Sequence, residues 1–263
     1  MSTNRKKTWD IWIIALCVAT CVMEFVKISF TGNAFRDGML SKILQQTFGS
    51  VAMILLMVRS GLRLFDKPQN LLYLVPCLVI AIDNFPFYSY FQGNMQWVRT
   101  EFVDVFLFSL YCLTVGIFEE SIFRGIVFYA IASRFSKDRQ GFIKTYILSS
   151  VVFGLAHLMN IFGGNVGAVV LQIGYSTLTG GLFAFALLKT QNIFCAGIVH
   201  AVYNFCGLLF DAQGLGNGIV FDTATVITML IVSVVVGIFV LYKVWTYSDT
   251  ERAVLYRHFG IED

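Results

Sequence analysis

The stretch that decides the fold covers residues 102–135 and reads FVDVFLFSLYCLTVGIFEESIFRGIVFYAIASRF. Two apolar runs, 102–118 and 122–135, meet in it across the paired carboxylates Glu119 and Glu120. A straight helix over the whole stretch would be about 50 Å long, which is more than one crossing of a membrane needs. We therefore expect one interrupted or kinked helical unit, with two acidic side chains at the interruption.

Apolar runs of similar character fill most of the chain on both sides of this unit. Of the 263 residues, 57% are hydrophobic and 13% are charged, and the mean hydropathy is +0.73. A soluble domain carries about 25% charged residues. The other apolar runs lie at residues 11–30, 43–58, 71–82, 142–158, 166–188, 193–210 and 223–240. Because a crossing helix needs about 20 mostly apolar residues, the sequence predicts an all-α, polytopic transmembrane helix bundle of about eight spans.

The remaining composition is consistent with one integral membrane domain over residues 1–263. The net charge of +3 is too weak and too dispersed to indicate a nucleic-acid partner. The six cysteines all fall in apolar segments without the spacing of metal ligands, so we interpret them as small hydrophobic residues. The expected partners are therefore the lipid bilayer and whatever substrate reaches its interior.

Basic residues gather at the N-terminus and in every second loop, which is the pattern of cytoplasmic segments. They are Arg5, Lys6, Lys7, Arg59, Arg63, Lys67, Arg134, Lys137, Arg139, Lys189, Lys243, Arg252 and Arg257. The aromatic residues Trp9, Trp12, Tyr242, Trp245 and Tyr247 flank the first and last spans, as interfacial belts do. We expect both termini to be cytoplasmic, although Arg36, Lys42 and Arg99 then fall on the opposite side.

A few polar side chains inside the apolar segments are candidates for function, because such groups are costly in a bilayer. Glu120 and Arg124 are four residues apart and can form an ion pair on one helix face. Glu119 points about 100° away from Glu120 and lacks that partner. His200 and Asn204 also share a face, on a later span.

The depth of these groups along their helices provides an independent indication. If the chain turns at the basic loop near residue 138, Glu119 and His157 both lie about 22 Å along their helices from that turn. His200 and Asn204 lie about 16 and 22 Å beyond Lys189. Four groups from three helices can therefore converge at one level of the membrane.

A carboxylate and an imidazole in a low-dielectric cavity can activate water, while a second imidazole and a carboxamide can stabilise an oxyanion. That chemistry needs no cofactor. Alternatively, Glu119, His157 and His200 could bind zinc, with one position left open for water. The same groups could also serve a proton- or ion-coupled transporter, or only a structural network. The residues alone leave these alternatives open.

These residues also carry the motifs of a known family. Residues 119–125 read EESIFRG, residues 153–157 read FGLAH, and residues 200–204 read HAVYN. In this order and separation they match EExxxR, FxxxH and HxxxN, across residues 100–210. The chain thus resembles the CAAX protease and bacteriocin-processing (Abi) family of intramembrane endopeptidases, with its catalytic core in that range. Relatives often have Pro before the paired glutamates, where this chain has Gly116 and Ile117, so we expect Gly116 to break the helix instead.

The resemblance implies a glutamate-dependent, possibly metal-dependent membrane hydrolase. Glu119 and His157 would activate the water, His200 and Asn204 would stabilise the oxyanion, and Glu120 and Arg124 would support them. It implies a peptide or membrane-associated protein as substrate, and a single-domain protein of a bacterial plasma membrane. Since the family also includes bacteriocin-immunity proteins, a non-catalytic role stays an alternative.

Overall fold

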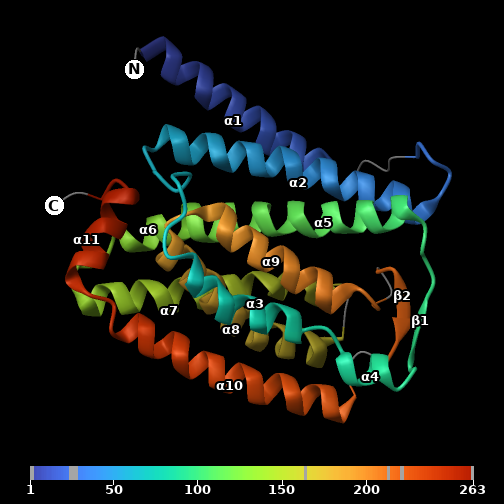
Figure 1. The fold of residues 1–263 in the computed structure, drawn as a ribbon. Helices are drawn as coiled ribbons and strands as arrows, with labels where there is room; N and C mark the ends of the chain where they lie inside the picture. The colour runs from blue at the N-terminus through green and yellow to red at the C-terminus, as the bar shows by residue number, and fades with distance from the viewer. Residues whose placement is uncertain (1–2, 24–28, 163–164, 212–213, 220–221, 262–263) are drawn as a thin grey trace.

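The computed structural model describes residues 3–23, 29–162, 165–211, 214–219 and 222–261, without the side chains of residues 3–10. The α-helices are α1 (Thr3–Met23), α2 (Ala34–Arg59), α3 (Leu74–Asp83), α4 (Phe87–Phe91), α5 (Phe102–Glu120), α6 (Phe128–Ala132), α7 (Arg139–Ala156), α8 (Val166–Thr190), α9 (Ile193–Leu208), α10 (Thr223–Trp245) and α11 (Asp249–His258). The other elements are the 3₁₀ segments η1 (Leu71–Tyr73) and η3 (His157–Phe162), the π-helical segment η2 (Ser121–Val127), and the antiparallel strands β1 (Met95–Trp97) and β2 (Gly216–Gly218). Figure 1 shows them arranged as a helix bundle.

Each apolar run of the sequence coincides with a helical segment, so the all-α architecture is confirmed. Within the described residues, five helical stretches are long and apolar enough to cross a membrane: Ala34–Arg59, Phe102–Ala132, Arg139–Phe162, Val166–Thr190 and Thr223–Trp245. Ile11–Met23, Leu71–Asp83 and Ile193–Leu208 are apolar but shorter. The number of crossings therefore stays a prediction, and residues 24–28 of the first expected span lie outside the described part.

Polar side chains mark the starts of the helices. The carboxamide oxygen of Asn33 accepts hydrogen bonds from two backbone N–H groups of α2, and that of Asn165 does the same for α8. Asn192 caps α9, and Asp222 caps α10. Because the first N–H groups of a helix have no partner within the helix, these caps explain why α2, α8, α9 and α10 begin at their observed residues.

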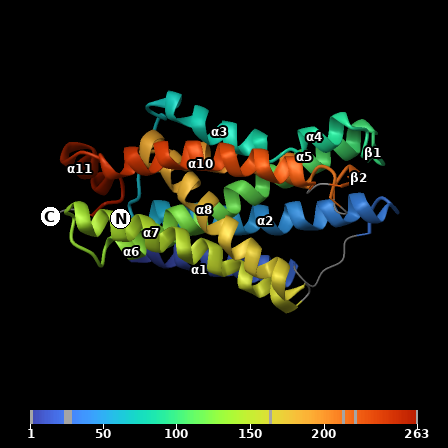
Figure 2. The same cartoon turned by 90° about the horizontal axis from the view of Figure 1, so that it is seen from below.

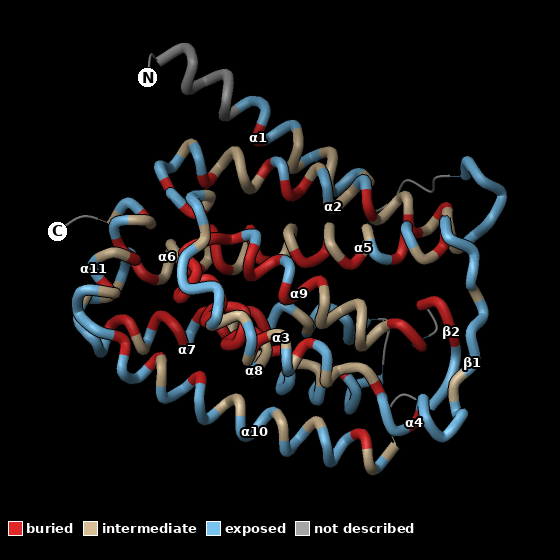
Figure 3. Tube along the Cα trace, in the orientation of Figure 1, coloured by how far each residue is buried: buried red, intermediate tan, exposed pale blue. Residues whose placement is uncertain are grey.

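Helix α10 shows how the bundle meets its surroundings. Its apolar side chains are largely exposed, with Leu230 at 63% and Val235 at 64%, and Figure 3 shows most of the helix in the colours of exposed and intermediate residues. A contiguous apolar surface of this kind is unfavourable in water and favourable in lipid. Together with the long apolar helices, it identifies an integral membrane protein.

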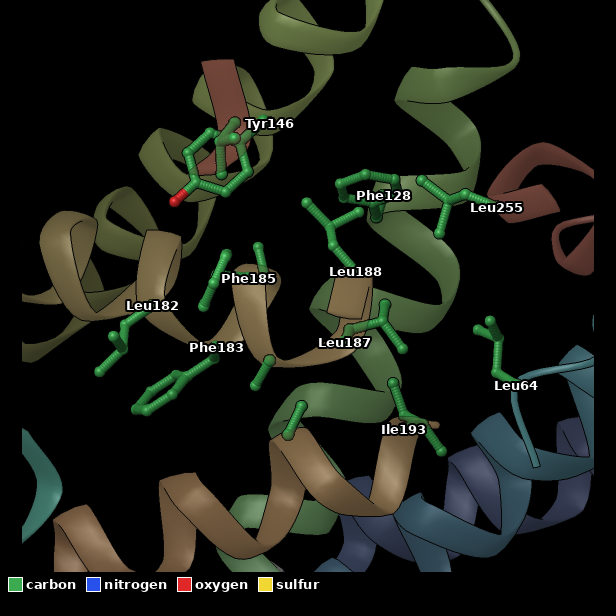
Figure 4. Packing of buried hydrophobic residues seen from close by; sticks show 14 of the residues in the cluster. Leu64, Phe128, Tyr146, Leu182, Phe183, Phe185, Leu187, Leu188, Ile193 and Leu255 are labelled. Atoms are coloured by element: carbon green, nitrogen blue, oxygen red, sulfur yellow. The ribbon is translucent and has the colours of Figure 1, made fainter. Parts of the chain in front are cut away.

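The packed core surrounds the second half of α8. Every residue from 180 to 190 is buried, which is the pattern of a helix enclosed on all sides. Figure 4 shows Phe183, Phe185 and Leu188 of this stretch among side chains from neighbouring helices, including Phe128 of α6 and Ile193 of α9. The first half of α8 is mostly exposed or half-buried, so the bundle has one solid half and one more open half.

The basic segments gather at the solid end of the bundle. Figures 1 and 2 place both termini, the α6–α7 turn and α11 at the same end. Backbone hydrogen bonds join the loops there, from Ile193 to Leu64 (2.9 Å) and from Arg63 to His258 (2.7 Å). Lys189 pairs with Glu251 at 2.7 Å. The alternation of basic loops in the sequence thus corresponds to one physical end, whose membrane side stays a prediction.

The three basic residues that do not fit the alternating pattern, Arg36, Lys42 and Arg99, lie toward the opposite end, where each has a local partner. The Arg36 side chain pairs with Glu101 and Asp104, each at 2.6 Å. Arg99 donates to the Gly214 carbonyl at 2.7 Å. Lys42 lies 5.3 Å from the Tyr111 ring centroid. Since carboxylates balance Arg36, it is a weak topological signal.

Gly116 does not break the helix, contrary to the sequence-based expectation. Helix α5 continues through it to Glu120, and the deviation comes later, in the π-helical segment η2. A Cβ at Gly116 would lie 2.3 Å from the Gly197 carbonyl oxygen of α9. The glycine is therefore required for the close crossing of α5 and α9, the two helices that carry the paired glutamates and His200.

Replacing Gly116 by alanine should separate α5 from α9. The backbone oxygen of Gly197 cannot move aside as a side chain could, so we expect a loss of about 1–3 kcal/mol. Gly174→Ala is the matched control, because a Cβ at Gly174 of α8 meets nothing within 4 Å. Thermal unfolding in detergent measures both variants, and equal melting temperatures would contradict a close crossing at Gly116.

Single-cysteine labelling in a cysteine-free background tests the arrangement of the two ends. A membrane-impermeant thiol reagent should reach a cysteine at Gln140 from the same side as one at Arg257, and a cysteine at Gln92 from the other side. A tag at the N-terminus should lie on the side of Gln140. If cysteines at positions 140 and 92 are both labelled from the same side, the bundle does not span the bilayer along its long axis.

Candidate active site

The paired glutamates stand at the end of α5, where the chain passes into η2. The carboxylate of Glu120 lies 3.0 Å from Nε of Arg124, and both side chains are 0% exposed. The ion pair expected from their spacing is therefore present. Short π-helical segments often occur at functional sites, and this one contains Arg124 itself.

Arg124 extends the network to two further helices. Its Nη2 donates to the Gly180 carbonyl of α8 at 2.8 Å, and its guanidinium lies 4.6 Å from the Phe153 ring centroid of α7. A buried guanidinium needs such partners, because water cannot replace them. The arginine thus joins η2 to α7 and α8.

His200 adds α9 to the same network. Its Nδ1 lies 3.0 Å from Oε1 of Glu120, and its Nε2 lies 3.9 Å from Oε2 of Glu119. The imidazole stacks on the Phe183 ring with centroids 4.4 Å apart and planes inclined by 15°. A carboxylate that faces a guanidinium accepts hydrogen bonds, so Nδ1 carries the proton of the contact with Glu120. The other ring nitrogen faces Glu119.

Glu119 is placed differently from its neighbour. Its side chain is 29% exposed, whereas Glu120 is fully buried, and it lines a cavity that Glu120 does not reach. Helix geometry explains the difference, since successive side chains point about 100° apart. One carboxylate of the pair is committed to Arg124, and the other is accessible from the cavity.

His157 begins η3, directly after α7. Its Nδ1 lies 3.1 Å from the Phe153 carbonyl oxygen, one turn earlier. Because a carbonyl can only accept, Nδ1 carries a proton in this contact, and Nε2 of the neutral ring is an acceptor. His157 and Asn204 both line the cavity that Glu119 lines.

The cavity has a volume of about 1410 Å³ and lies in the more open half of the bundle. Its walls come from α3, α5, η2, α7, η3, α8, α9 and α10. Glu119, His157, His200 and Asn204 all line it, so the structure brings the expected catalytic residues to one space. Among the described contacts, none joins His157 or Asn204 directly to Glu119.

Sequence reasoning missed two features of this site. It paired Glu120 with Arg124 alone, whereas Glu120 also contacts His200, which lies 80 residues away along the chain. It also gave no role to Phe183, on which His200 stacks. No sequence signal could have indicated the first contact, since the spacing of residues on different helices is not periodic.

The zinc alternative needs Glu119, His157 and His200 to meet as ligands. In the part of the chain that the structure describes, no group of three or more His, Cys, Asp or Glu side chains is close enough to bind a metal ion. The donor set does not fit a zinc site in this arrangement.

The fold and the site define the class of protein: a helical membrane protein with carboxylate, imidazole and carboxamide groups around one internal cavity. Residues 101–206 match the family model described as "Type II CAAX prenyl endopeptidase Rce1-like". The match confirms the resemblance to the CAAX protease family, whose members are intramembrane proteases. Comparison with curated proteins and with solved structures found no match.

Arg124→Ala should destabilise the protein as well as inactivate it. The substitution leaves the Glu120 carboxylate buried without its cation, which costs about 3–5 kcal/mol for a buried pair. Arg134→Ala is the control, because Arg134 is an exposed arginine just after α6 whose Nη1 donates to the Ala130 carbonyl. Thermal unfolding in detergent gives the comparison. An Arg124→Ala protein with normal stability but no turnover would instead place Arg124 among the catalytic groups.

Proposed function

We propose that the protein is an intramembrane endopeptidase that hydrolyses peptide bonds of a small or membrane-associated substrate without a cofactor. The observation that carries the proposal is the accessible carboxylate of Glu119, in one cavity with His157, His200 and Asn204. The family match over the three motifs supports it. That all four residues line one cavity supports a joint role for them.

In the proposed mechanism, Glu119 is the general base. It takes a proton from a water molecule as the water oxygen attacks the carbonyl carbon of the substrate. His157 assists, because its Nε2 can accept a hydrogen bond from the same water. The proton held by Glu119 then passes to the nitrogen of the leaving amine as the C–N bond breaks.

The oxyanion of the tetrahedral intermediate is assigned to His200 and Asn204. The Asn204 carboxamide supplies two N–H donors whatever the pH near neutrality. His200 has Nδ1–H directed at Glu120, so donation to the oxyanion requires a second proton on Nε2. Glu120 and Arg124 are positioning residues: they fix the ring of His200 and do not touch the substrate.

The proposed orientation follows from the basic end of the bundle. Both termini and the α6–α7 turn would face the cytoplasm of a bacterial cell. The residues that line the cavity come from the opposite half of the bundle, which ends in the strands β1 and β2 (Figure 1). The substrate would therefore enter from that half or laterally from the bilayer.

Glu119→Gln should abolish peptide cleavage and leave folding intact, because glutamine has the same shape and cannot take a proton from water. We expect a loss of at least about 10²-fold, the lower range for general base catalysis. Glu101→Gln is a matched control: Glu101 is an exposed carboxylate beside α5, and its partner Arg36 keeps Asp104. Turnover by purified protein in detergent is measured with a fluorogenic peptide library. A Glu119→Gln variant that cleaves at the unmodified rate would refute the assignment.

The same preparation separates the hydrolase from its alternatives. A transporter would move a solute in proteoliposomes and leave peptides intact, and a non-catalytic immunity protein would do neither. A hydrolase cleaves peptides in detergent without any gradient. Cleavage that a strong chelator abolishes and zinc restores would contradict the cofactor-free mechanism.

A further inference from the structure

The walls of the cavity carry charge of one sign. Three of the described lining residues are carboxylates, Asp83, Glu119 and Asp211, and none is lysine or arginine. The imidazoles of His157 and His200 are the other titratable nitrogens that line it. The cavity is partly open, with Asp83 half-buried and Asp211 exposed, so these carboxylates can act on a molecule that enters it.

The two aspartates stand apart from the catalytic network. Asp83 is the last residue of α3, and Asp211 follows the end of α9. Within the described residues, neither side chain forms a hydrogen bond or an ion pair, whereas Glu120 has Arg124 and His200. Their charge is therefore available to a ligand in the cavity.

The basic residues toward this end of the bundle are engaged elsewhere. Arg36 pairs with Glu101 and Asp104, and Arg99 donates to the Gly214 carbonyl while lying 4.4 Å from the Phe35 ring centroid. Lys42 lies over the Tyr111 ring and is not itself a lining residue. Arg36 thus neutralises two carboxylates that do not line the cavity, Glu101 and Asp104, whereas among the described residues no lysine or arginine lines the cavity beside Asp83 and Asp211.

Aromatic rings in the cavity walls also favour a positively charged ligand. The cavity is also lined by the rings of Phe118, Tyr175 and Tyr203, and aromatic ring faces attract cations. Amide and hydroxyl groups, including Asn84, Asn160 and Gln172, supply hydrogen bonds for a peptide backbone. Such a surface favours an extended, positively charged peptide over an acidic one.

We propose that the substrate is a cationic peptide segment, and that Asp83 and Asp211 select it. This inference rests on the proposed function and names the substrate class of the same cavity. Lysine or arginine side chains near the scissile bond would face the two aspartates, while the backbone reaches Glu119. Acidic side chains at the same positions would be repelled.

The test uses three peptides that share one cleavable core and differ at flanking positions, which carry Lys, Gln or Glu. We expect kcat/KM to decrease in that order, and to depend on salt because ions screen the attraction. Asp83→Asn and Asp211→Asn should each lower the Lys-to-Gln ratio, on the order of two- to five-fold, the range for partly solvated charge pairs. Glu101→Gln, outside the cavity, should leave the ratio unchanged. Equal rates for the three peptides, or a ratio that neither aspartate variant changes, would overturn the proposal.

A binding measurement separates this proposal from the proposed function. Fluorescence anisotropy of the same labelled peptides on Glu119→Gln protein reports selection without turnover. Preferential binding of the Lys peptide, lost in Asp83→Asn and Asp211→Asn derivatives, supports cationic selection even if no peptide is ever cleaved. If all three peptides are cleaved and bind equally well, the proposed hydrolase function stands and the proposed selection of cationic peptides is wrong.

Discussion

The buried carboxylate of Glu120 is the interaction on which the arrangement of the other helices depends. Its oxygens contact Arg124 of η2 and His200 of α9, each at 3.0 Å. Transfer of two charges out of water costs several kcal/mol for each ion, so the pair is tolerable only with good geometry and additional donors and acceptors. The Gly180 carbonyl accepts from Nη2 of Arg124 and the Phe153 ring lies against the guanidinium, whereas Nε and Nη1 form no hydrogen bond with the described residues. One ion pair therefore fixes α5, α7, α8 and α9 against each other.

This constraint also explains how two adjacent glutamates acquire different environments. Because Glu120 is held by Arg124, the helix rotation is fixed, and Glu119 must point into the cavity. The close crossing at Gly116 brings α9 near enough for His200 to approach both carboxylates. The accessible group is thus positioned by its buried neighbour. Loss of the pair would disturb Glu119 even though the two side chains do not interact.

Most of the fold could be predicted from the sequence, since apolar runs of the right length specify helices wherever they are flanked by caps such as Asn33 and Asp222. The Glu120–Arg124 pair was predictable for the same reason, as both residues lie on one continuous helical segment. The contact between Glu120 and His200 was not, because it depends on how α5 crosses α9. The role of Gly116 could not be predicted for the same reason. A glycine in a helix permits either a bend or the close approach of another helix, and which of the two occurs depends on how α9 packs against α5.

The two histidines differ in what holds their Nδ1 atoms, and this difference bears on the proposed chemistry. His157 faces the neutral Phe153 carbonyl, which leaves Nε2 of the neutral ring able to accept a proton or a hydrogen bond from water. His200 faces the Glu120 carboxylate with Nδ1, at 3.0 Å, and Glu119 with Nε2, at 3.9 Å. A ring nitrogen that accepts a hydrogen bond, as in His157, suits the activation of the attacking water. A ring nitrogen that donates one, as proposed for His200, suits the stabilisation of the oxyanion. Glu120 therefore has a proposed positioning role as well as a structural one, because the carboxylate that pairs with Arg124 also holds Nδ1 of His200, which leaves Nε2 facing Glu119.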